Sequence, residues 1–264
     1  MKRILLPALA LLLANTGFAM DAREIMQKVY DREDGNNAVM DMDMLLIDSK
    51  GDQRQRVVKS WRRDAGEQGK DTETIMFFLE PADVKNTGFL TYDYDDSAKD
   101  DDQWLYLPAL KKTKRIASSD KSSSFMGTDF TYADMTKRNI NNYTYTLLKE
   151  DIVEGNKVWV IESVPANEKE REETGYSKSI AFVRQDNFVV VRGVSILQTG
   201  GKVKYMEIRK LEQVDGIWVG TETVMTTKKD KAVEHQTVLK SRNVQFNQPL
   251  QNDLFTTRRL EQGL

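Results

Sequence analysis

Cysteine is absent from the 264 residues, and histidine occurs once, as His235. Without cysteine the chain has no disulfide framework, no thiol nucleophile and no Cys-based metal site. It also lacks the cysteine that carries the lipid of a bacterial lipoprotein, so we expect no membrane anchor of that kind. A lone histidine in the strand-like stretch 233–238 has no second histidine with which to share a metal ion. We expect it to be neither catalytic nor metal-binding.

Long apolar runs are scarce, and the clearest one stands at the N-terminus. Two cations at residues 2–3 precede an apolar run over 4–14, and small residues occupy the −3 and −1 positions of a cleavage site after Ala19. This is the pattern of a secretory signal peptide, and the run is shorter than the roughly 20 residues of a membrane span. We predict a signal peptide over 1–19 and a soluble periplasmic chain over 20–264. An uncleaved anchor or a buried helix is the alternative.

The chain also lacks an excess of positive charge. It has 39 Lys and Arg against 41 Asp and Glu, a formal net charge of −2. Loss of the two cations of the signal peptide moves this from −2 to about −4. A net acidic chain does not favour nucleic-acid binding, and neither a Gly-rich phosphate loop nor a nucleophile elbow occurs. We therefore expect no nucleic-acid partner, no cofactor and no enzyme activity.

Residues with β propensity make up most of the chain. One helix is expected from Asp21, whose spacing to Glu24 resembles a capping box, to about Glu33. Beyond it the apolar period falls from 3.6 to about 2, and Gly-bearing turns separate the runs, as in antiparallel hairpins. Such a series predicts one domain built as a large curved sheet, a sandwich or a barrel. About eleven strands are expected, at 40–44, 56–61, 75–79, 89–92, 103–107, 157–161, 179–183, 188–197, 202–211, 217–226 and 233–244.

Two charged stretches invite a binding interpretation. Six aspartates lie within residues 93–102, but the Gly and terminal Glu of an EF-hand are missing, so a solvated loop is favoured and no metal site is expected. Four cations lie within 111–115. These could meet anionic lipid head groups or an acidic partner, or they could belong to solvated strands.

The alternating apolar faces are the candidate binding surface. Met40, Met42 and Met44 alternate with Asp41 and Asp43, and methionine adapts to varied apolar shapes. Alternation alone does not distinguish a filled core from a hollow one. The candidate cavity residues are Met40, Met42, Met44, Trp61, Ile75, Phe77, Leu79, Phe89, Trp104, Trp159 and Phe182.

Three segments in the middle of the chain carry a family resemblance: WLYLP at 104–108, KRI at 114–116 and FMGTDFTY at 125–132. Together they resemble the periplasmic outer-membrane lipoprotein-sorting proteins, larger relatives of the carrier LolA and its receptor LolB. The resemblance implies a mainly β (α+β) fold, in which a single antiparallel half-barrel has a few helices over its concave face. It also implies that the apolar interior binds the acyl chains of lipids or lipoproteins.

The resemblance further implies partners and a mobile element. Members of the family are linked to inner-membrane transporters of the RND type, so such a transporter and an outer-membrane acceptor are the expected partners. A non-enzymatic accessory subunit with a filled core is the alternative, and a hydrolase or metal-dependent enzyme is the weakest one. The expected lid or motif residues are Phe125, Met126, Gly127, Asp129 and Phe130.

Local expectations follow for that middle segment. We expect residues 125–130 to leave the sheet and pack against it, with Phe125 and Phe130 as anchors and Gly127 in a backbone conformation that favours glycine. A short helix is expected from Asp129 or Thr131 to about residue 138. Another is expected over 167–173, which is charged and has no apolar face.

Overall fold

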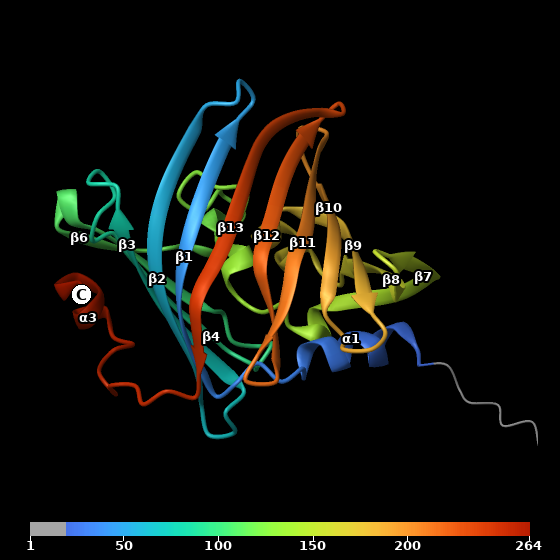
Figure 1. Cartoon of the computed structure of the whole chain (residues 1–264), viewed down its shortest axis with the longest axis horizontal. Helices are drawn as coiled ribbons and strands as arrows, with labels where there is room; N and C mark the ends of the chain where they lie inside the picture. Colours follow the sequence, from blue (N-terminus) through green and yellow to red (C-terminus); the bar gives the residue numbers. More distant parts are fainter. Residues whose placement is uncertain (1–19) are drawn as a thin grey trace, which may run out of the picture.

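The computed structural model describes residues 20–264, so the predicted signal peptide at 1–19 lies outside the described residues. These residues form one antiparallel sheet of thirteen strands with three short α-helices, α1 (Ala22–Tyr30), α2 (Glu168–Thr174) and α3 (Thr257–Gln262). The strands are β1 (Asn37–Asp48), β2 (Gln53–Ala65), β3 (Asp71–Glu80), β4 (Gly88–Asp93), β5 (Asp102–Leu107), β6 (Lys112–Arg115), β7 (Tyr143–Val153), β8 (Asn156–Pro165), β9 (Tyr176–Arg184), β10 (Val190–Leu197), β11 (Lys202–Val214), β12 (Ile217–Lys229) and β13 (Ala232–Phe246). The predicted fold, one curved and unclosed antiparallel sheet with few helices, is confirmed (Figure 1).

The strand order determines what covers the sheet. It runs β6-β5-β4-β3-β2-β1-β13-β12-β11-β10-β9-β8-β7, so the first and last strands pair at the centre. Strands β6 and β7 are consecutive in the chain but lie at opposite edges. Residues 116–142, here called the crossing segment, must therefore run from one edge to the other. Figure 1 shows this segment behind the front strands, within the curve of the sheet.

The two strands that the sequence did not predict are the two edges, β6 and β7. Strand β6 reads Lys-Thr-Lys-Arg, and the residues of β7 from 146 to 150 are all exposed. Edge strands carry polar and charged side chains that discourage pairing with another chain. Such strands lack the alternation on which the prediction depended.

The crossing segment contains less helix than expected. It has only 3₁₀ turns, at Ser118–Asp120, Ala133–Met135 and Ile140–Asn142, in place of a helix to residue 138. The carboxylate of Asp129 binds the sheet instead of capping a helix, and Thr131 caps a single turn by accepting from the backbone N–H of Asp134 (3.2 Å). The other two helices match their predictions closely. Helix α1 begins at a complete capping box between Asp21 and Glu24 and ends at Tyr30, and α2 follows Asn167.

The sheet buries apolar side chains on both faces in its β1–β5 half. On the inner face, toward the crossing segment, Met44, Phe78 and Phe89 pack together. On the outer face, Ile75 and Phe77 of β3 pack against the C-terminal residues Leu254, Phe255 and Leu260. Because β3 is buried on both faces, its apolar residues form an unbroken run. Figure 1 shows α3 on the outside of the sheet.

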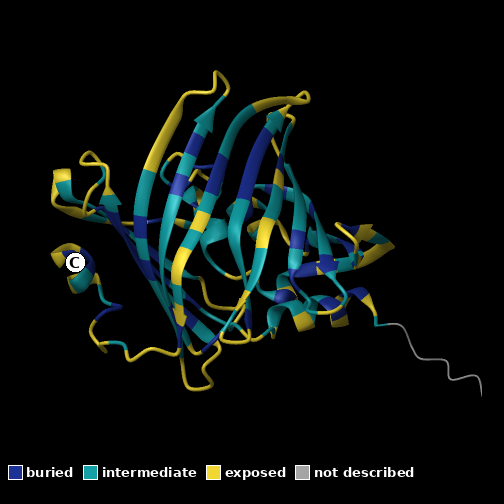
Figure 2. Cartoon of the chain, in the orientation of Figure 1, coloured by how far each residue is buried: buried dark blue, intermediate teal, exposed yellow. Residues whose placement is uncertain are grey.

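Exposure is highest at the hairpin tips. Figure 2 shows exposed turns between β1 and β2 and between β12 and β13, and buried stretches along the middle of these strands. Among the described residues, none of the helices is both long and apolar enough to cross a bilayer.

Candidate functional site

Aromatic packing attaches the crossing segment to the inner face. Phe125 is 1% exposed, and its ring centroid lies 4.9 Å from that of Phe89 and 6.2 Å from that of Phe78. Gly127 adopts φ +76°, the left-handed conformation expected for it. Phe130 is only half-buried. The segment therefore leaves the sheet and packs on it as predicted, with Phe125 as the main aromatic anchor.

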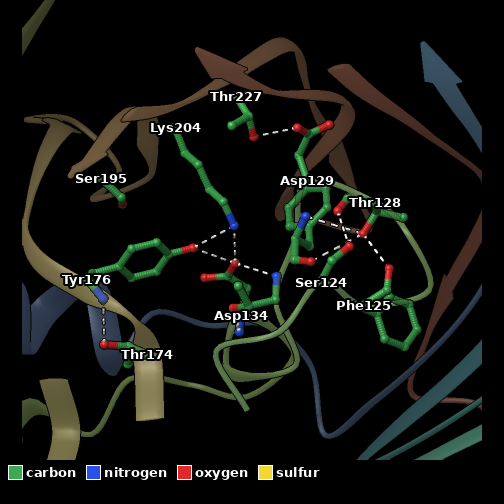
Figure 3. Close-up of polar contacts among 12 residues, drawn as sticks. Ser124, Phe125, Thr128, Asp129, Asp134, Thr174, Tyr176, Ser195, Lys204 and Thr227 are labelled. Atoms are coloured by element: carbon green, nitrogen blue, oxygen red, sulfur yellow. Dashed lines mark hydrogen bonds and ion pairs between the residues drawn. The ribbon is translucent and has the colours of Figure 1, made fainter. Parts of the chain in front are cut away.

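Asp129 is a second anchor, formed by hydrogen bonds. Its carboxylate accepts from the hydroxyls of Thr227 (2.5 Å) and Thr237 (2.7 Å) and lies 2.7 Å from Nδ1 of His235. Its backbone N–H donates to Oγ1 of Thr237 (3.0 Å). Figure 3 shows the Thr227 bond. A buried carboxylate is tolerated only when donors surround it, and three side chains of β12 and β13 provide them. The lone histidine thus has a structural partner in the FMGTDF motif.

A third anchor lies around Asp134. The phenol of Tyr176 donates to Oδ2 of Asp134 (2.8 Å), and the ammonium of Lys204 donates to Tyr176 Oη (3.2 Å) and lies 3.9 Å from the same carboxylate (Figure 3). Burial lowers the pKa of Lys204, and the carboxylates of Asp134 and Asp129 oppose that shift. The three anchors together attach the segment to six strands, namely β3, β4, β9, β11, β12 and β13.

An apolar cavity of about 350 Å³ lies beside the crossing segment. Its volume falls at the lower end of the range for small-molecule pockets, roughly 300–1,000 Å³. Helix α1 forms one wall, and the inner faces of β7–β12 form the floor. The apolar lining includes Met26, Val29, Tyr145, Ala181, Met206 and Met225.

Helix α1 is held over this cavity at both ends. The guanidinium of Arg23 donates to Asn141 Oδ1 (2.6 Å), and the phenol of Tyr30 donates to Asp95 Oδ1 (2.7 Å). Between them, Ile25 is fully buried with Ile161 and Val183. The wall is thus attached by its own apolar face and by two polar contacts at its ends.

A polar pocket of about 100 Å³ adjoins the apolar cavity. It is lined by charged side chains of the acidic stretch, the crossing segment and α2. Lys137 and Arg138 line both pockets and so stand at the boundary between them. The composite site has an apolar end and a charged end.

The acidic stretch is largely engaged within the protein, as are two of the four cations of the basic stretch. Asp102 pairs with Arg115, Asp100 with Lys169, and Lys114 with Asp120. Asp93 is buried, which raises its pKa to about 7, with the charge of Asp101 adding to the effect. Within residues 20–264, the acidic side chains and His235 form no cluster suited to a metal ion.

The candidate lining residues from the sequence do not form one face. The pairing of β1 with β2 has no bulge, so Met40, Met42 and Met44 lie on the same side of the sheet. Met42 and Met44 pack with Phe89 in the inner cluster. Met40 packs with Ala38 instead. The others lie elsewhere. Trp61, Ile75, Phe77, Leu79 and Trp104 pack toward the C-terminal segment, Trp159 packs with the α1 group, and Phe182 with the valines of β8 and β10.

The expectation of one continuous lining is therefore corrected by the structure. None of the eleven side chains lines the cavity beside α1. The sequence shows which residues alternate, but it does not show that a C-terminal segment covers the outer face of the same strands. Met206 and Met225, which are paired across β11 and β12, do line the cavity. The argument applied to Met40, Met42 and Met44, methionine within a strand, could have found them.

Comparison with known proteins agrees with the fold. A family model described as an uncharacterized protein matches residues 70–262, which is more than half of the chain. The chain belongs to this family. It is similar to the crystal structure of a DUF1329 family protein from Desulfovibrio piger, with 26% identity, a TM-score of 0.82, and coverage of 90% of this chain and 97% of that one.

Two further structures connect the family to the predicted resemblance. A putative outer membrane lipoprotein-sorting protein domain from Vibrio parahaemolyticus is 27% identical, with a TM-score of 0.81 over 91% of this chain and 98% of that chain. A LolA superfamily protein from Nitrosomonas europaea shares the fold, with a TM-score of 0.68 and 16% identity over 91% of this chain and 100% of that chain. The predicted resemblance is confirmed. No curated protein is significantly similar to the chain.

Proposed function

We propose that the protein is a periplasmic carrier that binds the acyl chains of lipids or lipoproteins and releases them to an acceptor. The observation that carries the proposal is the apolar cavity between α1 and the inner faces of β7–β12. Burial of an acyl chain contributes about 0.8 kcal/mol per CH₂. A cavity lined by Met26, Met206 and Met225 provides that burial with side chains that adjust to chain shape.

The location and partners belong to the same proposal. The N-terminal signal pattern and the likeness to a lipoprotein-sorting domain support export to the periplasm. An inner-membrane transporter of the RND type and an outer-membrane acceptor are the proposed donor and recipient of the cargo. Cross-linking in intact cells, with a photoreactive residue placed at the exposed Leu110 of the β5–β6 connection, tests for both partners.

Binding without chemistry fits the polar groups near the cavity. The Asp129 and Asp134 clusters consist of side chains that bond each other and hold the crossing segment. We propose that they position the cavity wall and perform no reaction. An accessory subunit with a filled core remains the alternative proposal.

Native mass spectrometry of protein purified from the periplasm without detergent tests the carrier directly. We expect a lipid or acylated peptide to co-purify. Met206→Asp places a carboxylate in the cavity and should abolish both the co-purified mass and binding of a fluorescent acyl probe. Val233→Asp, at an exposed position of the β12–β13 hairpin, is the matched control. A wild-type protein that carries no lipid and binds no probe would support the accessory role instead.

A further inference from the structure

Arg138 occupies the boundary between the apolar cavity and the polar pocket. Its guanidinium carbon lies 5.4 Å from the ring centroid of Tyr176 and 5.7 Å from that of Tyr143. Both phenols are turned to other partners, since Tyr176 donates to Asp134 and Tyr143 donates to Glu170. The aromatic faces therefore hold the guanidinium plane without using its N–H donors.

The neighbouring carboxylates are already engaged. Asp134 also accepts from the backbone N–H of Thr131 (2.8 Å), and Glu170 accepts from Asn142 (2.9 Å). In the described chain, no carboxylate lies within 4.0 Å of the Arg138 guanidinium. Its side chain is exposed to the space that the two pockets share. Five donors in a planar fork are thus left for a ligand or for water.

Three of the four other cations that line the polar pocket are paired with carboxylates. Lys121 pairs with Glu173 (3.0 Å), Lys137 with Asp34 (3.2 Å), and Lys169 with Asp100. Their charges are largely balanced locally, so they contribute less to the attraction of a further anion. Lys99 has no ion pair either, but it lies over the ring of Tyr94 (3.3 Å) and lines the polar pocket alone. Arg138 differs because it also lines the apolar cavity and because the acidic groups that act on its charge, Asp134 and Glu170, already accept from other donors.

We propose that Arg138 binds the anionic head group of a single-chain amphiphile whose tail enters the apolar cavity. Guanidinium is the side chain best suited to carboxylate and phosphate, which it binds through two parallel N–H···O bonds. The cavity lies directly next to it, so a head group at Arg138 leaves the tail facing Met206, Met225 and Val29. The modest cavity volume favours one acyl chain over a lipid with several. This inference rests on the proposed carrier function and specifies its ligand.

The ligand class has two sources, a fatty-acid carboxylate and a lysophospholipid phosphate. The test compares three probes with the same hexadecanoyl chain, namely palmitate, lysophosphatidate and uncharged monopalmitoyl glycerol. Each displaces a fluorescent acyl probe from the mature protein below its micelle concentration. Inorganic phosphate serves as the head group alone. We expect palmitate, lysophosphatidate or both to bind more tightly than the glycerol ester. The relative affinities of palmitate and lysophosphatidate identify whether the head group is a carboxylate or a phosphate.

Substitutions distinguish the loss of the head-group contact from a loss of folding. Arg138→Gln should lower affinity for the anionic probes about tenfold or more, while affinity for monopalmitoyl glycerol changes less than about twofold. Arg138→Lys keeps the charge and should recover part of the loss. Arg242→Gln removes a guanidinium that pairs with Asp43 elsewhere on the protein and should leave all affinities unchanged. Thermal unfolding of each variant verifies that it is folded.

Three outcomes would overturn the inference. Equal affinities for charged and uncharged probes, or equal losses for both in Arg138→Gln, would remove the head-group role but leave the acyl carrier intact. Phosphate binding as tight as that of lysophosphatidate would show an anion site independent of the tail. Failure of every acyl probe to bind would overturn the carrier and the head-group site together.

Discussion

Asp129 and Thr237 bond each other twice. The backbone N–H of Asp129 donates to the threonine hydroxyl at 3.0 Å, and that hydroxyl donates to the aspartate carboxylate at 2.7 Å. Thr237 is fully buried at the centre of β13. One hydroxyl thus satisfies both a backbone donor and a buried charge, and it joins the FMGTDF motif to the middle of the sheet.

Thr237→Val should therefore destabilise the fold by about 1–3 kcal/mol, because it leaves a buried N–H and a carboxylate short of a partner. Urea unfolding measures this. Thr226→Val is the matched control, since its hydroxyl accepts only from the side chain of Gln236 (2.9 Å), which is half-buried and can turn to water. Equal losses in the two variants would contradict the anchoring role of Asp129.

Asp93 predicts a pH dependence of stability. Its folded pKa of about 7 exceeds the unfolded value of 3.8 because the carboxyl is buried and lies near Asp101. The folded state then binds more protons than the unfolded state between these values, so this contribution to stability is present below about pH 4 and is lost as pH rises to about 7.

Asp93→Asn keeps the oxygen that accepts from the backbone N–H of Lys137 and removes the charge. It should stabilise the protein at pH 8 by roughly 1–3 kcal/mol and change it little at pH 4. Unfolding at both pH values measures this, with Asp52→Asn at an exposed turn as the control. A stability gain that is the same at both pH values would exclude the ionisation of Asp93 as the cause.

Two methionines should differ in their contribution to stability. Met44 is 4% exposed in the inner cluster, so Met44→Ala should cost about 2–5 kcal/mol. Met206 is half-buried and faces the cavity, where fewer atoms surround it, and Met206→Ala should cost about 1 kcal/mol or less. Chemical unfolding compares them. A similar loss for both would indicate that the cavity is filled.

The C-terminal segment should affect stability but not ligand binding. Leu260 is fully buried on the outer face, where its Cδ1 lies against Gly88 and Phe77. Leu260→Ala should cost about 2–5 kcal/mol and leave binding of an acyl probe at the inner cavity unchanged. Binding that falls at temperatures where the variant is still folded would place the outer cluster in the ligand path.

Sequence patterns located the central strands well and the edges poorly. The alternation of Met40 to Met44 placed β1 correctly, because one face carries apolar side chains, with Met44 buried, and the other carries the half-buried carboxylates Asp41 and Asp43. Strand β3 is buried on both faces, so its apolar run identified a strand but gave no orientation. The covering element, residues 250–262, lies far away in sequence, and no local pattern links it to Ile75 or Phe77.

The middle segment was predicted to pack on the sheet, but the residues that line the cavity were not predicted. The FMGTDF resemblance correctly marked a segment that packs on the sheet, and Phe125 and Asp129 are its anchors. The cavity instead depends on which strands come to lie beneath α1 and the crossing segment. That depends on pairing of β1 with β13 and on the separation of β6 from β7, neither of which has a local sequence signal.

The crossing segment has a mechanical consequence, since it joins both free edges of an open sheet. Its 27 residues, counted from 116 to 142, could reach roughly 90 Å if fully extended. Chain length therefore does not restrain the edges from spreading. The restraint comes from the attachments at Phe125, Asp129 and Asp134, which divide a long tether into short spans. Loosening one attachment would lengthen a span and widen the opening. Under the proposed carrier function, the strength of these bonds would therefore set the size of the largest ligand that the sheet admits.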